Sequence, residues 1–375
     1  MSIAVGVTTL VLGSTGLAAA SSVPDGLPAV PHGNPDTVFS KNGPYDPGVA
    51  FQTTPEGDTL VITYPVDPAS TVSKPHYVIN LLRWFTGSPT APIPAGLPTN
   101  LPTTLATDAF SNVPIAQSGP FPVVLFSHGY GGYPEQSSFL TDHLATWGFV
   151  VVAPDHRSRD LHAVLTGTTG RGQDDITDLQ QALAVVRFMN AAPDDVLSHK
   201  LDFSRLATLG HSAGGGAALT FAADSPAVRT YVALAPAPGK LPKHKRGLIM
   251  QGTSDKVVSP AGTKKLYASL TGPKRLILID RAGHNVFDDG CTIGAAQGGL
   301  VTFVKKLNLP PAFVAIATDG CVAPDLYPTK AWPLIDQAVT AELRWGLGID
   351  KTPIGLGGGL DHTFAGVTAS VKSSN

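Results

Sequence analysis

The stretch Leu-Gly-His-Ser-Ala-Gly-Gly at residues 209–215 decides how the rest of the chain is interpreted. Residues 205–209 are predicted to form a short buried strand, and residues 217–223 to begin a helix. A Gly-x-Ser-x-Gly pattern between a strand and a helix is typical of the nucleophile elbow, a tight turn that holds a serine hydroxyl above a sheet. Because the same pattern occurs in ordinary turns, Ser212 needs chemical partners elsewhere in the sequence before it can be assigned a role.

Composition limits the class of protein and of partner. The chain has 375 residues, 43% hydrophobic and 14% charged, which is enough for one large core or two modest ones. Its formal net charge of −2 gives no reason to expect nucleic acid or an anionic membrane as a partner. The sequence has no internal repeat and no linker between two cores. We therefore expect one domain over residues 21–375, with a Pro-rich N-terminal arm and a C-terminal extension after about residue 290.

The N-terminus has the pattern of a targeting segment. Residues 3–20 are apolar or small, carry no charge and end in an Ala-rich run. This pattern predicts a signal peptide over residues 1–20 with cleavage near Ala20 and export to the medium, periplasm or cell envelope. The usual basic segment is missing, so two alternatives stay open: a true start that lies upstream, or a membrane anchor. No other stretch is long and apolar enough to cross a bilayer, and no stable membrane insertion is expected after processing.

The chain contains two cysteines, Cys291 and Cys321. In an exported protein an isolated pair predicts a disulfide. Two cysteines without a matching histidine cluster are poor evidence for zinc, and we expect no metal and no other cofactor.

The remaining pattern predicts an α/β fold. Residues 59–65 are predicted to be an edge strand because Pro65 ends the run, and the Pro-rich residues 86–120 a long surface loop. Further strands are predicted at 122–127, 148–153, 228–234, 246–251 and 275–280, and helices at 139–147, 174–190 and 300–307. Strands that alternate with helices predict a mostly parallel, doubly wound sheet with right-handed crossovers.

Two residues fit as partners of Ser212. A catalytic serine needs a base, and the base needs a carboxylate that orients it. In such sheets the chain order is serine, acid, histidine, each on a loop at the carboxyl end of a strand. Asp255 and His284 each follow a predicted strand in this order. The sequence therefore predicts Ser212, Asp255 and His284 as a catalytic triad.

Three other aspartates lie near enough in sequence to compete with Asp255. Asp280 is predicted to belong to a strand, whereas Asp288 and Asp289 closely follow the histidine and are expected to be solvated or to bind local partners.

Three other histidines also need an interpretation. His211 should point away from Ser212, while His128 and His156 lie at strand ends, where they could line the pocket. A metal site built from His128, Asp155 and His156 is conceivable, but nothing else in the sequence supports it.

An oxyanion hole is expected beside the serine. The loop Ser-His-Gly-Tyr-Gly-Gly-Tyr at residues 127–133 follows the first central strand, and its glycines allow backbone N–H groups to turn toward a substrate oxygen. We assign the oxyanion hole to the backbone N–H groups of Tyr130 and Ala213. A phosphate-binding loop is excluded because the Lys-Ser/Thr ending is absent.

Four segments together resemble one group of α/β-hydrolases, the group of platelet-activating-factor acetylhydrolases and bacterial cutinase-like polyester hydrolases. They are residues 126–139, 147–157, 210–215 and 283–285. The resemblance covers about residues 45–290 and implies the α/β-hydrolase fold with a nucleophile elbow. It places the group's triad and oxyanion hole on the residues already assigned.

The chain departs from the polyester-degrading members at two positions. Those members carry Met after the nucleophile, where this chain has Ala213, and Trp after an Ala-Pro pair, where this chain has Ala237. In the group that Trp forms a wall for the substrate's ring, so its absence argues against activity on aromatic polyesters.

These observations predict a secreted serine hydrolase that cleaves carboxylic esters through an acyl-enzyme. The expected substrate is a small-molecule, lipid or polyester ester, and a lipase or acetylhydrolase is the alternative among enzymes. A non-catalytic binding protein on a hydrolase scaffold is the alternative from another class; the sequence leaves the oligomeric state open.

Overall fold

The computed structural model describes residues 27–70, 72–87, 103–293, 299–306 and 311–374. The predicted signal peptide and most of the Pro-rich segment before residue 103 lie outside these residues. In the described part of the chain, no helix has the length and apolar character that a bilayer span requires.

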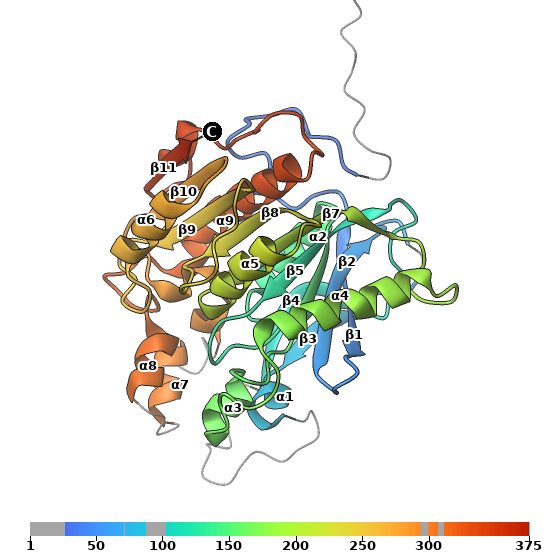
Figure 1. Ribbon diagram of the computed structural model, residues 1–375, viewed down its shortest axis with the longest axis horizontal. Coiled ribbons are helices and arrows are strands. Elements are labelled where there is room, and N and C mark those ends of the chain that lie inside the picture. Colours follow the sequence, from blue (N-terminus) through green and yellow to red (C-terminus); the bar gives the residue numbers. More distant parts are fainter. Residues whose placement is uncertain (1–26, 71, 88–102, 294–298, 307–310, 375) are drawn as a thin grey trace, which may run out of the picture.

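A twisted sheet runs through the molecule, in the order β11-β10-β9-β8-β7-β5-β6-β2-β1-β4-β3 (Figure 1). Its central strands are parallel: β6 (Val150–Pro154), β5 (Phe121–Ser127), β7 (Leu201–His211), β8 (Val228–Leu234), β9 (Arg246–Gly252) and β10 (Lys274–Ile279). Strands such as β5 are apolar and buried along their whole length, as expected where helices cover both faces of a sheet.

Helices cover the sheet on two sides. On one face α4 (Asp175–Ala191) packs with α5 (Ala213–Asp224), and on the other α2 (Ser138–Thr146) packs with α9 (Pro328–Gly346) (Figure 1). This is the doubly wound arrangement that the sequence predicts. The remaining helices are α1 (Leu81–Thr86), α3 (Leu161–Thr166), α6 (Pro260–Ser269), α7 (Gly299–Lys306) and α8 (Pro311–Thr318).

The N-terminal side of the sheet differs from the prediction. β2 (Thr59–Val66) is not an edge strand, because it lies between β6 and β1 (Asp46–Thr53). Its pairing with β6 ends at Thr63, so the missing N–H of Pro65 removes no hydrogen bond from that ladder. The expected surface loop also contains a strand, β4 (Thr104–Ser111), which pairs with β1 and with β3 (His76–Asn80).

The two ends of the described chain are tied into the body. Phe39 of the N-terminal arm is fully buried edge-on against Trp147, with ring centroids 5.0 Å apart, and its N–H donates to the α9 side chain of Gln337 at 2.7 Å. After α9, the last strand, β11 (Ala369–Ser374), pairs antiparallel with β10. The described part of the chain after residue 290 therefore contributes α9 to one face of the sheet and supplies its last strand.

Candidate active site

Ser212 occupies a sharp turn between β7 and α5. Its φ of 58° and ψ of −120° are strained for a residue with a side chain. The turn is tight because a Cβ at Gly210 would lie 2.1 Å from the carbonyl oxygen of Gly214, and a Cβ at Gly214 would lie 1.9 Å from that of Ser127. Only glycine fits at both positions, which explains the spacing of the elbow pattern.

Asp255 and His284 meet just beyond the carboxyl ends of β9 and β10. His284 Nδ1 lies 2.8 Å from Asp255 Oδ2. The other carboxylate oxygen accepts the N–H groups of Val257 and Val258, each at 2.8 Å, and Gln251 Nε2 donates to Oδ2 at 2.8 Å. The carboxylate is thus held in one orientation by several donors, as an acid that orients a histidine requires.

Ser212 and His284 line the same pocket. Among the described residues, Ser212 Oγ has no hydrogen-bond partner, so the contact that would carry the proton is not formed in this conformation. Catalytic hydrogen bonds are often long without substrate and tighten when it binds. The structure therefore brings the three predicted residues to one site, and their roles remain predictions.

The loop after β5 is fixed by a buried arginine. The Arg159 guanidinium donates to the carbonyl oxygens of His128 and Gly129, the latter at 2.7 Å, and to Ser127 Oγ at 3.1 Å. Within the described chain, the backbone N–H groups of Tyr130 and Ala213 have no acceptor. N–H groups without an acceptor beside a nucleophile are what an oxyanion hole requires, and the assignment of these two groups remains a prediction.

The sequence places His128 and His156 where they could line the pocket, but neither does. Both are fully buried beneath the loop, where His156 lies 2.8 Å from Asp178 Oδ2 and from Ser127 Oγ. Burial lowers the pKa of His156 and lowers the pKa of His128 to about 3. They are neutral parts of the support for the loop at residues 127–133, which we call the oxyanion loop after its predicted role.

The cluster that could bind a metal also consists of other residues than the sequence suggested. The carboxylates that approach His156 are those of Asp175 and Asp178. Arg159 Nε lies 3.0 Å from both oxygens of Asp175, so an arginine already supplies a cation to this cluster. We therefore interpret this cluster as a structural feature of the fold.

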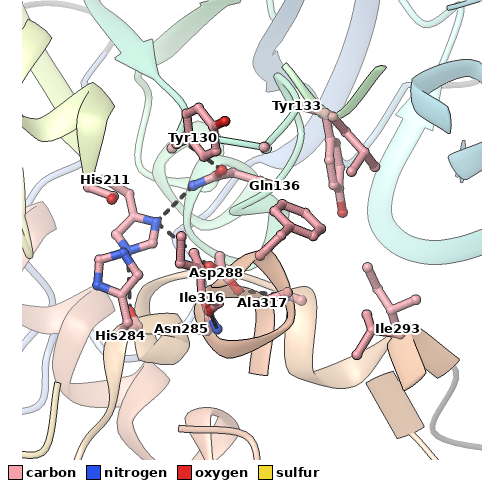
Figure 2. Close-up of a pocket in the computed structure, with 18 of the residues that line it drawn as sticks. Tyr130, Tyr133, Gln136, His211, His284, Asn285, Asp288, Ile293, Ile316 and Ala317 are labelled. Carbon is pink, nitrogen blue, oxygen red and sulfur yellow. Dashed lines mark hydrogen bonds and ion pairs between the residues drawn. The ribbon is translucent and has the colours of Figure 1, made fainter. Parts of the chain in front are cut away.

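His211 is the second correction among the histidines. Rather than pointing away from Ser212, it lines the same pocket as Ser212 and packs against the ring of His284, with centroids 4.7 Å apart. Gln136 donates to its Nδ1 at 3.0 Å, and its Nε2 lies 3.2 Å from the His284 carbonyl oxygen (Figure 2). Burial keeps the pKa of His211 well below its usual value, so it connects the two loops as a neutral ring.

The competing aspartates have other partners. Asp280 lies just past β10 and is largely exposed. Asp288 and Asp289 are buried rather than solvated. Asp289 accepts hydrogen bonds from the N–H groups of Ser138 and Phe139 at the start of α2, and Asp288 lies 3.6 Å from His211 Nδ1. None of the three contacts His284 Nδ1.

The pocket beside Ser212 is mostly apolar and encloses about 810 Å³, part of it open to solvent. One wall comes from α1 and α3, and the other from α7, α8 and the residues Gly290 and Ile293; the four helices lie at the same end of the molecule (Figure 1). Figure 2 shows the pocket itself. The apolar side chains of these walls are Phe85, Leu161, Leu165, Ile293, Val304, Phe313, Ile316 and Ala317. The helix expected at 300–307 is present as α7, and it forms part of this wall.

Cys291 and Cys321 form the predicted disulfide, with their Cα atoms 5.1 Å apart. The bridge joins the two ends of the segment that carries α7 and α8. It thereby fixes this wall of the pocket close to the loop of His284.

A family profile described as "PET hydrolase-like" matches residues 111–307, which is more than half of the chain. This chain belongs to the PET hydrolase-like family. The match and the doubly wound sheet confirm the predicted α/β-hydrolase fold. The family region contains Ser212, Asp255 and His284 but ends before α8.

Individual relatives share only part of their length with this member of the family. Cutinase est2 from Thermobifida alba is 28% identical over 185 residues, 45% of this chain and 54% of the relative. Lipase 1 from Moraxella sp. (strain TA144) is 28% identical over 171 residues, 42% and 46% respectively. Cutinase cut1 from Thermobifida fusca is 32% identical over 120 residues, 32% and 34%. The chain thus spans about half or less of the length of these curated relatives.

Sequence reasoning missed two polar residues that shape the site, Gln136 and Arg159. Gln136 accepts the N–H of Gly129 at 2.9 Å while it donates to His211. Each residue acts through contacts with distant segments, which no local pattern encodes. The only signal in the sequence is that both lie close to the glycine-rich loop or to the strand that follows it.

Proposed function

We propose that this protein hydrolyses carboxylic esters through an acyl-enzyme intermediate. The observation that carries the proposal is the 2.8 Å hydrogen bond between His284 and Asp255, next to a strained serine that lines the same pocket. The names of the relatives, cutinase and lipase, agree with ester hydrolysis.

Each residue of the site has a separate role in the proposed hydrolysis. His284 Nε2 takes the proton of Ser212 as Oγ attacks the ester carbonyl, and Asp255 stabilises the resulting imidazolium. The N–H groups of Tyr130 and Ala213 bind the negative oxygen of the tetrahedral intermediate. The imidazolium then gives its proton to the leaving alcohol. Water attacks the acyl-enzyme with His284 again as base, and free Ser212 and a carboxylic acid are released.

The pocket supports an ester with an aliphatic acyl or alcohol group. Its walls are formed mainly by apolar side chains, and such walls bind the apolar parts of a substrate. Lipids and aliphatic polyesters both contain ester groups with aliphatic chains. Ala237 stands where the resemblance to polyester hydrolases would place a Trp, so we propose that aromatic polyesters are poor substrates.

We further propose that the protein is exported and processed near Ala20. The disulfide supports an oxidising compartment, and the uncharged N-terminal segment supports a signal peptide. Intact-mass measurement of secreted protein tests this proposal. A mature protein that retains residues 3–17 and partitions with membranes would indicate an anchor instead.

Covalent labelling tests the enzymatic function. A fluorophosphonate should modify Ser212, as read by peptide mass spectrometry, and p-nitrophenyl esters from acetate to palmitate should be hydrolysed with a preference set by the pocket. The matched control is Ser212→Ala, which should be neither labelled nor active. Absence of both labelling and turnover in the unmodified protein would favour a non-catalytic binding protein on a hydrolase scaffold.

A further inference from the structure

One carboxylate joins the loop of the predicted acid to the loop of the predicted base. Asp319 Oδ2 accepts the backbone N–H of His284 at 2.8 Å and the backbone N–H of Lys256 at 3.0 Å. Lys256 directly follows Asp255 in the chain. The same oxygen atom therefore holds the backbone on both sides of the Asp255–His284 hydrogen bond.

Asp319 is itself held firmly against the His284 loop. Its carbonyl oxygen accepts the N–H of Asn285 at 3.0 Å, and Asn285 Nδ2 donates to the Ile316 carbonyl oxygen at 2.8 Å. The backbones are so close that a Cβ at Gly283 would lie 2.4 Å from the Cα of Gly320. Close backbone packing fixes where the Asp319 carboxylate can lie.

The Asp319 carboxylate is buried and pairs with an exposed lysine. The Asp319 side chain is only 3% exposed, and among the described residues the cation that pairs with it is Lys256 Nζ, 3.5 Å from Oδ1 and itself 71% exposed. Burying a carboxylate costs free energy that an apolar residue would not require. Here the carboxylate provides what an apolar residue cannot, namely an acceptor for two N–H groups on two different loops.

We propose that Asp319 is a positioning residue that sets the separation of the Asp255 and His284 loops, an inference that rests on the proposed function of the same site. Asp319 does not line the pocket beside Ser212, so it acts through the geometry of the triad and not through substrate contact. It lies outside the residues 111–307 that match the family. The segment after α8 thus contributes to the proposed chemistry as well as to the pocket wall.

Substitution of Asp319 separates positioning from general stability. Asp319→Ala should lower kcat for a soluble p-nitrophenyl ester by about 10²-fold with KM unchanged, because a small displacement of catalytic groups has effects of this size. The rate at which a fluorophosphonate labels Ser212 should fall by a similar factor. Asp319→Asn should restore most of the activity, since its amide oxygen can accept the same two N–H groups.

Asp325→Asn is the matched control. Asp325 lies 3.2 Å from Lys256 Nζ, so this variant removes the other carboxylate partner of the lysine without removing an acceptor from the two loops. It should leave kcat unchanged. Equal losses in Asp325→Asn and Asp319→Ala, or an unchanged kcat in Asp319→Ala, would overturn the proposal.

A spectroscopic measurement makes the test independent of turnover. The far-downfield proton resonance of the His284–Asp255 hydrogen bond should weaken or shift in Asp319→Ala and persist in Asp319→Asn and Asp325→Asn. If Asp319→Ala does not fold, Asp319→Ser takes its place in every comparison. If the unmodified protein is neither active nor labelled, the proposed function fails, whereas an unchanged resonance in the folded Asp319 variant overturns the positioning role itself.

Discussion

Phe313 of α8 packs against the backbone of Gly131, so closely that a Cβ at Gly131 would lie 2.4 Å from the Phe313 ring. Gly131 directly follows Tyr130, whose N–H is assigned to the oxyanion hole. The wall of the pocket and the oxyanion loop are therefore in direct contact. The positive φ of 68° at Gly131 favours glycine there for a second reason.

Phe313→Ala should widen the pocket and change its chain-length preference. We expect the ratio of kcat/KM for long over short p-nitrophenyl esters to rise by about tenfold, the order of effect that a change in apolar pocket volume produces. Val314→Ala is the control, because Val314 lies on the same helix but does not line the pocket. An identical chain-length profile in both variants would show that Phe313 does not limit the acyl site.

Substitutions in the predicted triad should lower kcat by different factors. Ser212→Ala and His284→Ala should each lower kcat by about 10⁶-fold, and Asp255→Asn by about 10⁴-fold because the histidine then adopts the wrong tautomer. Asp288→Asn is the control, since Asp288 is buried nearby but contacts His211 instead. Retained activity in Asp255→Asn together with its loss in Asp288→Asn would reassign the acid.

The sequence predicted the centre of this fold well because its signals there are local. The strands β8, β9 and β10 are apolar runs between clear turns, and each residue of the expected triad follows from its position after a strand. β4 was missed because its exposed and half-buried residues lie beside a Pro-rich segment, where no apolar run marks a strand.

The parts of the site that the sequence did not reveal depend on long-range contacts. Arg159 reaches from the loop after β6 to carbonyl groups after β5, and Asp319 reaches from the end of α8 to the loop of His284. The residues next to Arg159 and Asp319 in the sequence do not indicate these distant partners. The placement of α7 beside the pocket likewise follows from packing with α8 and not from its own helical pattern.

Arg159→Lys should impair the oxyanion hole. A lysine cannot donate in fixed directions to several carbonyl oxygens at once, so the loop of Tyr130 should lose its orientation. We expect kcat to fall by about 10²-fold, comparable to the loss of one oxyanion donor. Binding of a boronic acid that mimics the tetrahedral intermediate should weaken, while KM changes little.

The neighbouring Arg157 provides the control for this prediction. Its side chain is 55% exposed and pairs with Asp58, so Arg157→Lys should leave both kcat and boronic acid binding unchanged. If Arg159→Lys binds the boronic acid as tightly as the unmodified protein, the arginine does not orient the oxyanion loop.

The disulfide should stabilise the fold without taking part in the chemistry. Cys291 and Cys321 are 30 residues apart, and closing a loop of that size is worth about 3–4 kcal/mol in the free energy of unfolding. The double variant Cys291→Ser/Cys321→Ser should therefore have a lower Tm and faster thermal inactivation, with a nearly unchanged rate at low temperature. Thiol titration of the unfolded, unreduced secreted protein should detect no free thiol; two thiols would contradict the bridge.

Glu135 should make the stability of the protein depend on pH. The side chain is buried, and the Tyr77 hydroxyl donates to its Oε1. Desolvation raises the pKa of Glu135 from 4.5 to about 7. A raised pKa in the folded state means that the stabilising contribution is complete below pH 4.5 and is lost as the pH rises through about 7. Each unit of pKa difference corresponds to about 1.4 kcal/mol.

Glu135→Gln removes this titration and keeps an oxygen that accepts the Tyr77 hydroxyl. Between pH 4.5 and 7, the Tm of the unmodified protein should fall as the pH rises, relative to the Tm of the variant. In this range the unfolded unmodified protein loses the proton of Glu135 while the folded protein keeps it, and the variant has no such group. Thermal unfolding in a series of buffers measures the two slopes. Glu56→Gln, at an exposed position, should retain the slope of the unmodified protein. Parallel curves for Glu135→Gln and the unmodified protein would show that Glu135 does not contribute to the pH dependence.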